Sequence, residues 1–296
     1  MLHHHGIVLL DKAYGVSSNR ALQQVKSLFR AKRAGHTGSL DPLATGMLPI
    51  CLGEATKVAG HLLGARKAYR AELELGVVTT TADREGEVVT TRPVPELGRD
   101  DIERALARFR GTIRQRPPAY SALKQDGERL YLKARRGEDV VVPEREVRIL
   151  RLECVSYARP TLTIEVECST GTYIRSLAVD LGEALGCGAH LSGLRRLWVE
   201  PFEREQMWSI DALGERVRQG GSEALLPIDA ALRAWPEIRL DVAEAERLRR
   251  GMEVPRADPG WTGACRVYDA QGLLCALGDR SSDGTVRPKR LFLHGA

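Results

Sequence analysis

Residues 35–49 read GHTGSLDPLATGMLP, a stretch with three glycines, two prolines and a single aspartate, Asp41. It shows little apolar periodicity, so it is either an ordered loop or solvent-exposed chain. The apolar segment 47–52 favours the ordered loop. Glycines in such a loop let the backbone approach a ligand closely, and an aspartate there can be a nucleophile, a general base or only a turn residue.

Apolar patterns around this loop predict the elements that would hold it. Residues 7–10 form a short apolar run typical of a buried strand, and a helix capped by Ser17 and Ser18 follows. Residues 69–75 alternate between apolar and charged side chains, as in a half-buried strand. The same reasoning predicts, further along the chain, a helix from Asp100, paired strands over 147–157 and 161–168, a helix over 173–185 and a strand over 191–199.

Two segments depart from this pattern. Residues 117–145 are dense in charge and lack sustained periodicity, which is typical of a functional loop inserted between strands. After Pro236 the sequence changes to short β-like pieces separated by turns, at 238–240, 264–268, 273–277 and 290–293. We therefore expect a larger domain over 1–236 and a small β-rich domain over 237–296.

Composition limits the class of protein. Of the 296 residues, 43% are hydrophobic and 28% charged, which excludes a disordered or collagen-like chain. No apolar run approaches the roughly 18 residues of a membrane-spanning helix, and the N-terminus lacks the pattern of a secretory signal. The six cysteines are scattered without a C-x-x-C pair, which fits a reducing cytosol. We expect a cytoplasmic protein that does not enter a membrane.

Charge is uneven along the chain. Residues 1–70 hold ten Lys and Arg against three Asp and Glu, a net charge of +7, whereas the remainder carries −2. A basic first quarter fits a polyanionic partner that meets one face of the protein, and it fits a solvated basic face equally well.

Common catalytic signatures are absent. The sequence has no P-loop, no dinucleotide-binding glycine pattern, no H-E-x-x-H and no G-x-S-x-G, so nothing calls for a nucleotide cofactor or a metal. Residues 3–5 are histidines, but an exposed terminal trio is usually incidental. Four other polar residues have ordinary structural interpretations when each is taken singly. His36 is typical of a loop histidine, Tyr69 and Tyr173 of core tyrosines, and Arg175 of a surface arginine.

Taken together, the motifs resemble the TruB family of pseudouridine synthases, whose bacterial members modify uridine 55 of tRNA. The stretch 35–49 resembles the family's nucleophile segment. The resemblance covers nearly the whole chain and departs from it at Ala13, where proline is usual, and at Thr80, where aspartate is common. The other matching segments are 10–12 with 15–18, 67–70, 76–86, 117–124, 171–177, 186–191 and 194–196.

The resemblance implies an α+β fold with a central mixed, largely antiparallel sheet and a small C-terminal β-rich, PUA-like domain. It implies Asp41 as nucleophile, Arg175 as its ion-pair partner and Tyr69 stacked under the target uracil. The other residues that it implies in substrate binding are His36, beside the displaced nucleotide, Tyr173 and Leu194, which shape the uracil pocket, and Lys12 and Asp83.

The resemblance further implies no cofactor, no metal and no obligate protein partner. A monomer would bind the T stem-loop of tRNA, with residues 117–145 acting as a thumb that grips the RNA. The basic first quarter would then lie against phosphates.

The chemistry of the implied reaction agrees with these roles. A uracil inside a folded RNA loop must be flipped out, at a cost of roughly a few kcal/mol, and stacking on Tyr69 would return roughly 1–3 kcal/mol. His36 would fill the vacated space. A nucleophilic aspartate must be ionised, so we expect Arg175 to lower the pKa of Asp41. The Tyr69 hydroxyl or a water is the candidate base.

Three other functions compete with this one. The catalytic subunit of an RNA-guided pseudouridylation complex would use guide RNA and partners in place of the thumb, which the charged insertion argues against. A non-catalytic RNA-binding or RNA-folding protein would be favoured by loss of Asp41, Tyr69 or Arg175, and all three are present. A glycosidase usually needs a second carboxylate, and none lies near Asp41 in the sequence.

Overall fold

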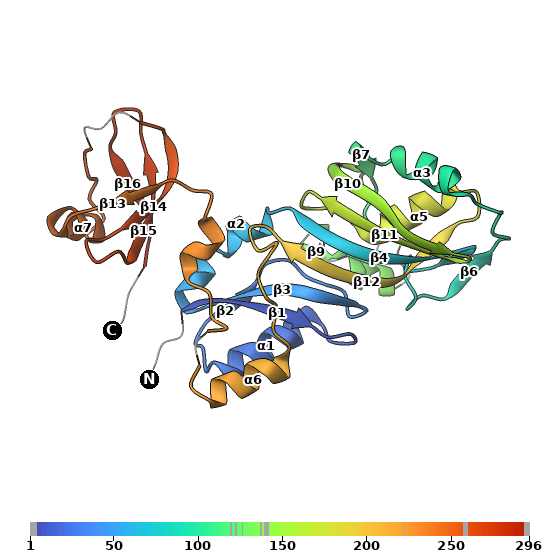
Figure 1. Ribbon diagram of the computed structural model, residues 1–296, viewed down its shortest axis with the longest axis horizontal. Helices are drawn as coiled ribbons and strands as arrows, with labels where there is room; N and C mark the ends of the chain where they lie inside the picture. Colours follow the sequence, from blue (N-terminus) through green and yellow to red (C-terminus); the bar gives the residue numbers. More distant parts are fainter. Residues whose placement is uncertain are drawn as a thin grey trace.

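The structure is a computed structural model that describes residues 5–118, 120–121, 123–125, 127–136, 138, 142–221, 223–256 and 260–292. An eight-stranded sheet runs through the larger part of the molecule in the order β1-β3-β12-β4-β11-β10-β7, with β2 added beside β3 (Figure 1). Among the described residues of this sheet, only β3 and β12 pair in parallel. Its strands are β1 (Gly6–Lys12), β2 (Ala34–His36), β3 (Ala44–Leu52), β4 (Lys67–Leu75), β7 (Gly111–Gln115), β10 (Arg145–Ala158), β11 (Thr161–Cys168) and β12 (Ala189–Val199).

Helices and two short ribbons surround this sheet. The mixed, largely antiparallel sheet with flanking helices confirms the expected α+β fold. The helices are α1 (Ser18–Leu28), α2 (Ala59–Leu63), α3 (Arg99–Ala107), α4 (Leu130–Arg135), α5 (Ile174–Ala184) and α6 (Ile210–Arg218), with 3-10 turns at Gly53–Lys57 and Ile228–Leu232. The ribbons pair β5 (Val77–Thr79) with β6 (Val88–Thr91) and β8 (Lys124–Gln125) with β9 (Glu128–Arg129).

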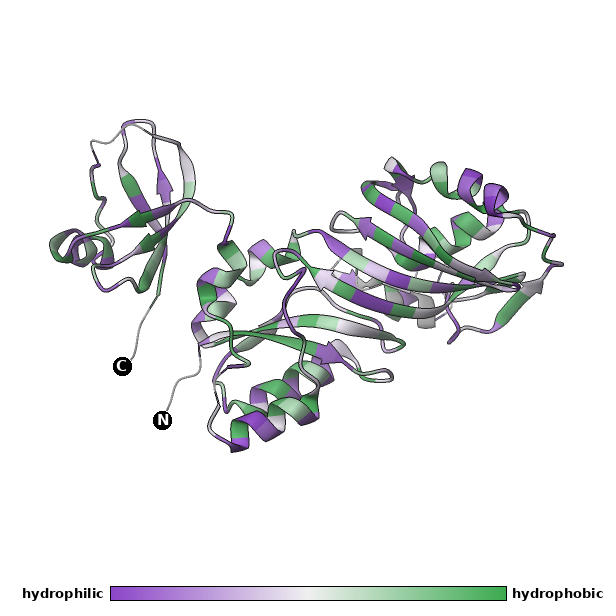
Figure 2. Cartoon of the chain, viewed as in Figure 1, coloured by the Kyte–Doolittle hydropathy of each residue, from purple (hydrophilic) through white to green (hydrophobic). Residues whose placement is uncertain are grey.

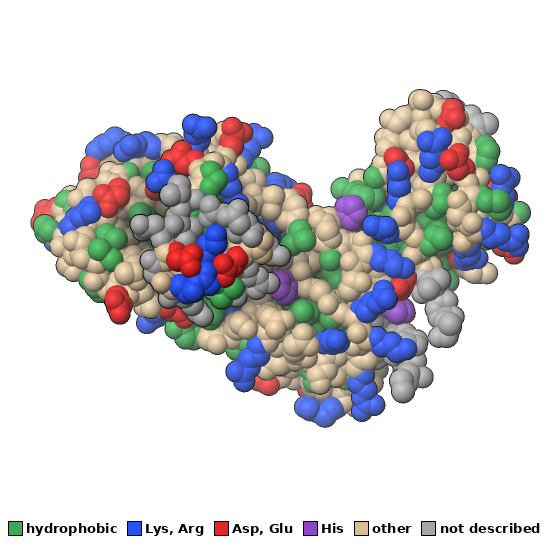
Figure 3. All heavy atoms as spheres, turned by 180° about the vertical axis from the view of Figure 1, so that it is seen from behind, with side chains coloured by type: hydrophobic (Ala, Val, Ile, Leu, Met, Phe, Trp, Pro, Cys, Tyr) green, Lys and Arg blue, Asp and Glu red, His purple; other side chains and the backbone are tan. Residues whose placement is uncertain are grey.

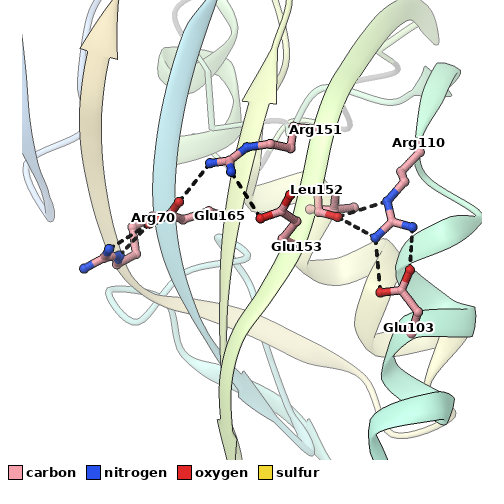
Figure 4. A network of polar contacts seen from close by, with 7 residues as sticks. All are labelled: Arg70, Glu103, Arg110, Arg151, Leu152, Glu153 and Glu165. Atoms are coloured by element: carbon pink, nitrogen blue, oxygen red, sulfur yellow. Dashed lines mark hydrogen bonds and ion pairs between the residues drawn. The ribbon is translucent and has the colours of Figure 1, made fainter. Parts of the chain in front are cut away.

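The two halves of the large sheet are covered differently. Helices α3 and α5 pack on one face of β4, β10 and β11, where Leu73, Ile164 and Leu177 are fully buried. The opposite face is polar, and Arg70, Glu165, Arg151 and Glu153 form a chain of ion pairs across three strands (Figure 4). This explains the alternation along residues 69–75, because successive side chains point to opposite faces.

Strands β1 and β3 are buried on both faces, and apolar residues dominate them in Figure 2. Val8 and Ile50 face α1 and α6, whereas Ile7 and Met47 face the segment 228–232 and part of the C-terminal sheet. Burial on both faces explains why residues 7–10 read as a continuous apolar run rather than an alternating one.

The C-terminal sheet runs in the order β13-β14-β15-β16. It contacts the larger part of the molecule, since the Tyr268 hydroxyl donates to Asp229 at 2.7 Å and Lys57 donates to the Leu291 carbonyl at 2.7 Å. Its elements are β13 (Glu237–Arg239), α7 (Val242–Arg249), β14 (Gly263–Tyr268), β15 (Leu274–Arg280) and β16 (Val286–Leu291).

Several elements differ from the sequence-based prediction. Helices α2, α6 and α7 were not predicted, and α7 begins with a capping box in which Asp241 and Glu244 bond each other's backbone N–H groups. The last strand covers 286–291 rather than 290–293, because Pro288 and its cationic neighbours hide the strand pattern. The insertion contains β8, β9 and α4, which its irregular periodicity did not indicate; its residues 119, 122, 126, 137 and 139–141 lie outside the described residues. Within the described part of the chain, no helix is long and apolar enough to cross a membrane.

The parallel pairing of β3 and β12 requires a glycine at position 46. Gly46 pairs with Arg196 and has a φ of 96°. A Cβ atom at this position would lie 2.2 Å from the Arg196 carbonyl oxygen. Both the left-handed backbone and the close approach therefore exclude a side chain.

We expect Gly46→Ala to lower the free energy of unfolding by more than about 2 kcal/mol, because the left-handed conformation costs about 1–2 kcal/mol and overpacking against backbone adds about 1–3 kcal/mol. Urea unfolding followed by circular dichroism measures this. Gly60→Ala in α2 is the control, since no atom lies within 4 Å of its added Cβ. Equal unfolding midpoints for the two variants would contradict the close approach.

Candidate active site

A cavity of about 360 Å³ opens beside the loop between β2 and β3. Five of the eight predicted site residues line it, and they come from four separate segments of the chain. They are Asp41, Tyr69, Tyr173, Arg175 and Leu194, whereas His36, Lys12 and Asp83 do not line the cavity.

The side chains of Ser18 and Lys12 hold the loop that carries Asp41 through hydrogen bonds to its backbone. The Ser18 hydroxyl donates to the Leu40 carbonyl at 2.9 Å and accepts from the Leu40 N–H at 2.7 Å. Lys12 is 1% exposed and donates to backbone carbonyls, including those of Val16 at 2.6 Å and Pro42 at 3.4 Å. The expectation that Lys12 contacts the substrate has no support in this position, since its ammonium is used to hold the loop.

Asp41 and Arg175 form an ion pair at 3.0 Å. The Arg175 side chain is 6% exposed, and it also lies 3.4 Å from Asp83 and donates to the carbonyls of Thr81 at 3.2 Å and Tyr120 at 2.9 Å. Because every contact fixes the guanidinium, Arg175 presents one N–H group to Asp41 in a defined direction.

Asp83 acts on this pair from outside the cavity. It is 3% exposed, and its Oδ1 accepts from the Thr81 hydroxyl at 2.6 Å and from the Glu85 N–H at 3.1 Å. The fold thus brings a second carboxylate close to Asp41, which the sequence did not show. The oxygens of Asp83 face hydrogen-bond donors and Arg175. This arrangement positions Arg175, whereas the second carboxylate of a glycosidase must deliver a proton to a leaving group.

The pKa of Asp41 differs from the sequence-based expectation. Burial raises the pKa of Asp41 above its usual value, and Arg175 opposes this shift without reversing it. Asp83 raises the pKa of Asp41 further, whereas Lys12 lowers it. The expectation of a lowered pKa was wrong because it counted the arginine and not the desolvation of the loop. Solvent still reaches 43% of the Asp41 side chain through the cavity.

Tyr69 lies on the buried face of β4 and is 8% exposed. Its cross-strand neighbour is Arg196 of β12. Burial raises the pKa of Tyr69, and Arg196 acts in the opposite direction. The phenol therefore stays protonated at neutral pH, with a cation beside it that would stabilise negative charge on its oxygen.

His36 lies at the end of β2 and is half-buried. Burial, followed by the charge of Arg196, lowers the pKa of His36. Within the described residues its Nδ1 has no hydrogen-bond partner. A neutral imidazole of this kind suits a space-filling or stacking role better than an ionic phosphate contact.

Three cations that line the cavity were missed as site residues: Lys67, Arg145 and Arg196. Arg196 donates to the carbonyls of Met47 at 2.6 Å and Gly38 at 3.2 Å. Burial lowers the pKa of Lys67 to about 8. Strand alternation could have found two of them, because Lys67 lies two residues before Tyr69 and Arg196 two residues after Leu194.

In the part of the chain that the structure describes, no group of three or more His, Cys, Asp and Glu side chains is placed to hold a metal ion. Of the N-terminal histidines only His5 is described, and its Nδ1 accepts from the Glu54 N–H at 3.1 Å.

Solved structures share this architecture. A structure titled "Crystal Structure of a Cbf5-Nop10-Gar1 Complex" matches with a TM-score of 0.73 and 25% identity, over 98% of this chain and 85% of that one. Another, titled "Structure of H/ACA RNP bound to a substrate RNA containing 2'-deoxyuridine", matches with a TM-score of 0.73 at 23% identity.

Sequence comparison gives much higher identity. A protein of Xanthomonas axonopodis pv. citri (strain 306) named "tRNA pseudouridine synthase B" is 54% identical over 97% of this chain and 94% of its own length. A protein of the same name from Pseudomonas aeruginosa (strain UCBPP-PA14) is 47% identical over 97% and 95%.

Family models cover nearly all of the chain. The model "TruB family pseudouridylate synthase (N terminal domain)" matches residues 26–174. The models "tRNA pseudouridylate synthase B C-terminal domain" and "Pseudouridine synthase II TruB, C-terminal" match residues 175–233 and 236–292. The chain belongs to the TruB family of pseudouridylate synthases.

Proposed function

We propose that this chain isomerises uridine 55 in the T-loop of tRNA to pseudouridine. The observation that carries the proposal is the carboxylate of Asp41, held 3.0 Å from a buried arginine in a cavity that the aromatic residues Tyr69 and Tyr173 also line. The relatives named tRNA pseudouridine synthase B support tRNA as the substrate.

In the proposed reaction, the cavity holds the flipped base and supplies the nucleophile. The flipped uracil stacks on Tyr69, and Tyr173 and Leu194 bound the space in which the base turns. Asp41 attacks the ribose or the uracil ring as the C1′–N1 bond breaks. The base then rotates and C1′ bonds to C5. The bond that Asp41 formed breaks, the proton on C5 leaves, and N1 takes up a proton. Substrate and product are isomers, so the reaction consumes no water, oxidant or reductant.

The surface offers a path for RNA. Exposed Arg30, Lys32 and Arg33 precede the loop that carries Asp41, and Lys and Arg side chains border the hollow between the C-terminal sheet and the rest of the molecule (Figure 3). The segment 117–145 would act as the thumb and residues 237–296 as a PUA-like RNA-binding domain. We propose that the chain acts as a monomer in the cytoplasm and binds phosphates electrostatically.

RNA-guided action is the main alternative, since one matched structural neighbour is titled as a complex of proteins and another matched structure as an RNP bound to a substrate RNA. Two observations favour independent action: identity to the tRNA enzymes is 54% against 25% to that neighbour, and the insertion forms its own short ribbon and helix over 124–135. A non-catalytic RNA-binding protein would have no need of an ion pair between the cavity carboxylate of Asp41 and the buried Arg175.

Release of tritium from C5 tests the function directly. Unmodified tRNA carrying tritium at uracil C5 should lose the label to water, because C5 becomes the glycosidic carbon. A tRNA with cytidine at position 55 is the control. Absence of release from folded protein would refute the enzymatic proposal, and release from the cytidine-55 tRNA would refute the position.

We expect Asp41→Asn to abolish tritium release while tRNA affinity changes by less than about tenfold. The variant keeps the side chain's size and loses its charge and nucleophilicity. Asp211→Asn on α6, which does not line the cavity, should retain activity. Turnover by Asp41→Asn in a preparation free of host enzyme would exclude Asp41 as the nucleophile.

We expect Tyr69→Phe to slow the reaction roughly 10²–10⁴-fold with little change in affinity, if its hydroxyl moves the proton. Arg196 beside the phenol favours this role, whereas the raised pKa of Tyr69 opposes it. Single-turnover tritium release measures the effect. Tyr157→Phe on β10 is the control, because Tyr157 does not line the cavity. A near-normal rate would leave Tyr69 with stacking alone, and an equally active Tyr69→Leu would remove it from the site.

Activity should fall as pH decreases through the raised pKa of Asp41, at a higher pH than an ordinary aspartate would give. Arg175→Met should move this acid limb to still higher pH, because Asp83 and Asp41 would then face each other without a cation. Single-turnover rates between pH 5 and 8 measure the shift. The matched control is Arg70→Met on the exposed sheet face. An unchanged limb in Arg175→Met would mean that a group other than Asp41 controls it.

A further inference from the structure

Gln115 is the last residue of β7 and is 1% exposed. Its carboxamide bonds both backbone groups of Tyr173. Nε2 donates to the Tyr173 carbonyl at 3.0 Å, and Oε1 accepts from the Tyr173 N–H at 2.7 Å. This double contact reproduces, with a side chain, the exchange of hydrogen bonds between two antiparallel strands.

Tyr173 needs such a partner because of its place in the fold. It is the residue before the first turn of α5, with an extended backbone and no side-chain cap of its own. Its ring lines the cavity, and Arg175 follows two residues later. The orientation of the Tyr173 peptide groups thus sets where the ring lies and where α5 starts.

The neighbours of Gln115 bind the same segment. The Arg116 carbonyl accepts from the Ser176 hydroxyl at 2.7 Å, and the Tyr120 carbonyl accepts from Arg175 at 2.9 Å. The end of β7 and the start of the insertion are therefore attached to the start of α5 through Gln115, Arg116 and Tyr120. On the β7 side of these contacts only Gln115 uses its side chain, because Arg116 and Tyr120 contribute backbone carbonyls. A substitution of Gln115 therefore removes its contact with Tyr173 and leaves the residues of α5 unchanged.

We propose that Gln115 is a positioning residue for the isomerisation, acting through the backbone of Tyr173 on the ring of Tyr173 and on Arg175. The inference rests on the proposed function. The peptide groups of Tyr173 require a neutral partner that donates one hydrogen bond and accepts another in the same plane. An amide does both, whereas a thioether or an ionised carboxylate does not.

Gln115→Met tests the contact, because it keeps the length of the side chain and removes both hydrogen bonds. We expect the single-turnover rate of tritium release to fall at least about tenfold, since small displacements of positioning groups cost up to about 10²-fold. Affinity for tRNA should stay within about threefold of wild type. Gln219→Met on the exposed end of α6 is the matched control, and its rate should be unchanged.

Gln115→Glu gives a second signature that packing alone would not produce. When protonated, the introduced carboxyl can donate to the Tyr173 carbonyl and accept from its N–H, whereas the ionised form repels the carbonyl. Burial should raise the pKa of this carboxyl. The rate relative to wild type should therefore rise as pH decreases, although the wild-type rate itself falls.

The outcomes separate the two proposals. Tritium release by wild type together with a Gln115→Met rate within about threefold of it would overturn the positioning role alone. If the Gln115→Met protein melts below the assay temperature, the Gln115→Glu variant tests the role instead. A ratio of the Gln115→Glu rate to the wild-type rate that does not change with pH would then overturn the positioning role. Absence of release by wild type would remove the proposed function, and the positioning role with it.

Discussion

The site depends on the interactions of one buried group, the guanidinium of Arg175. It lies between Asp41 and Asp83 and donates to two backbone carbonyls. A buried cation with several partners is costly to desolvate and more costly to leave unpaired. The loop of Asp41, the segment of Asp83 and the start of the insertion are therefore held in one arrangement. That constraint fixes the direction of the Asp41 carboxylate, the proposed nucleophile, before any substrate binds.

The sheet delivers the remaining groups to this point. The one parallel pair, β3 with β12, sets Leu194 beside Ala44 and Arg196 beside Gly46, while β12 pairs with β4 on its other side. Tyr69 and Arg196 thus become direct neighbours although they are far apart in the sequence. A cross-strand pair of this kind has a fixed separation, so the aromatic face and the cation reach the cavity together.

Burial gives the cavity its electrostatic character. It raises the pKa of Asp41 and lowers the pKa of Lys67 to about 8, so the charged form of each side chain is less favoured than in water. The positive charge of Arg175 limits the shift of Asp41, whereas the positive charge of Arg196 adds to the shift of Lys67. Under the proposed function, a nucleotide that enters this cavity would meet cations that are already partly desolvated, which favours close contact over loose electrostatic attraction.

The sequence by itself determined the strands and helices that surround the site, together with the identity of its central residues. The alternation of residues 69–75 indicates a strand buried on one face, and the apolar run of residues 7–10 indicates a strand buried on both faces. The motifs around Asp41, Tyr69 and Arg175 carry the family resemblance. Tertiary structure alone decided the sign of the Asp41 pKa shift, the use of Lys12 to hold a loop, and the contact of Gln115 with Tyr173. Each of these depends on desolvation or on groups from distant segments. A local pattern records which face of an element is buried, but it does not record what lies against that face.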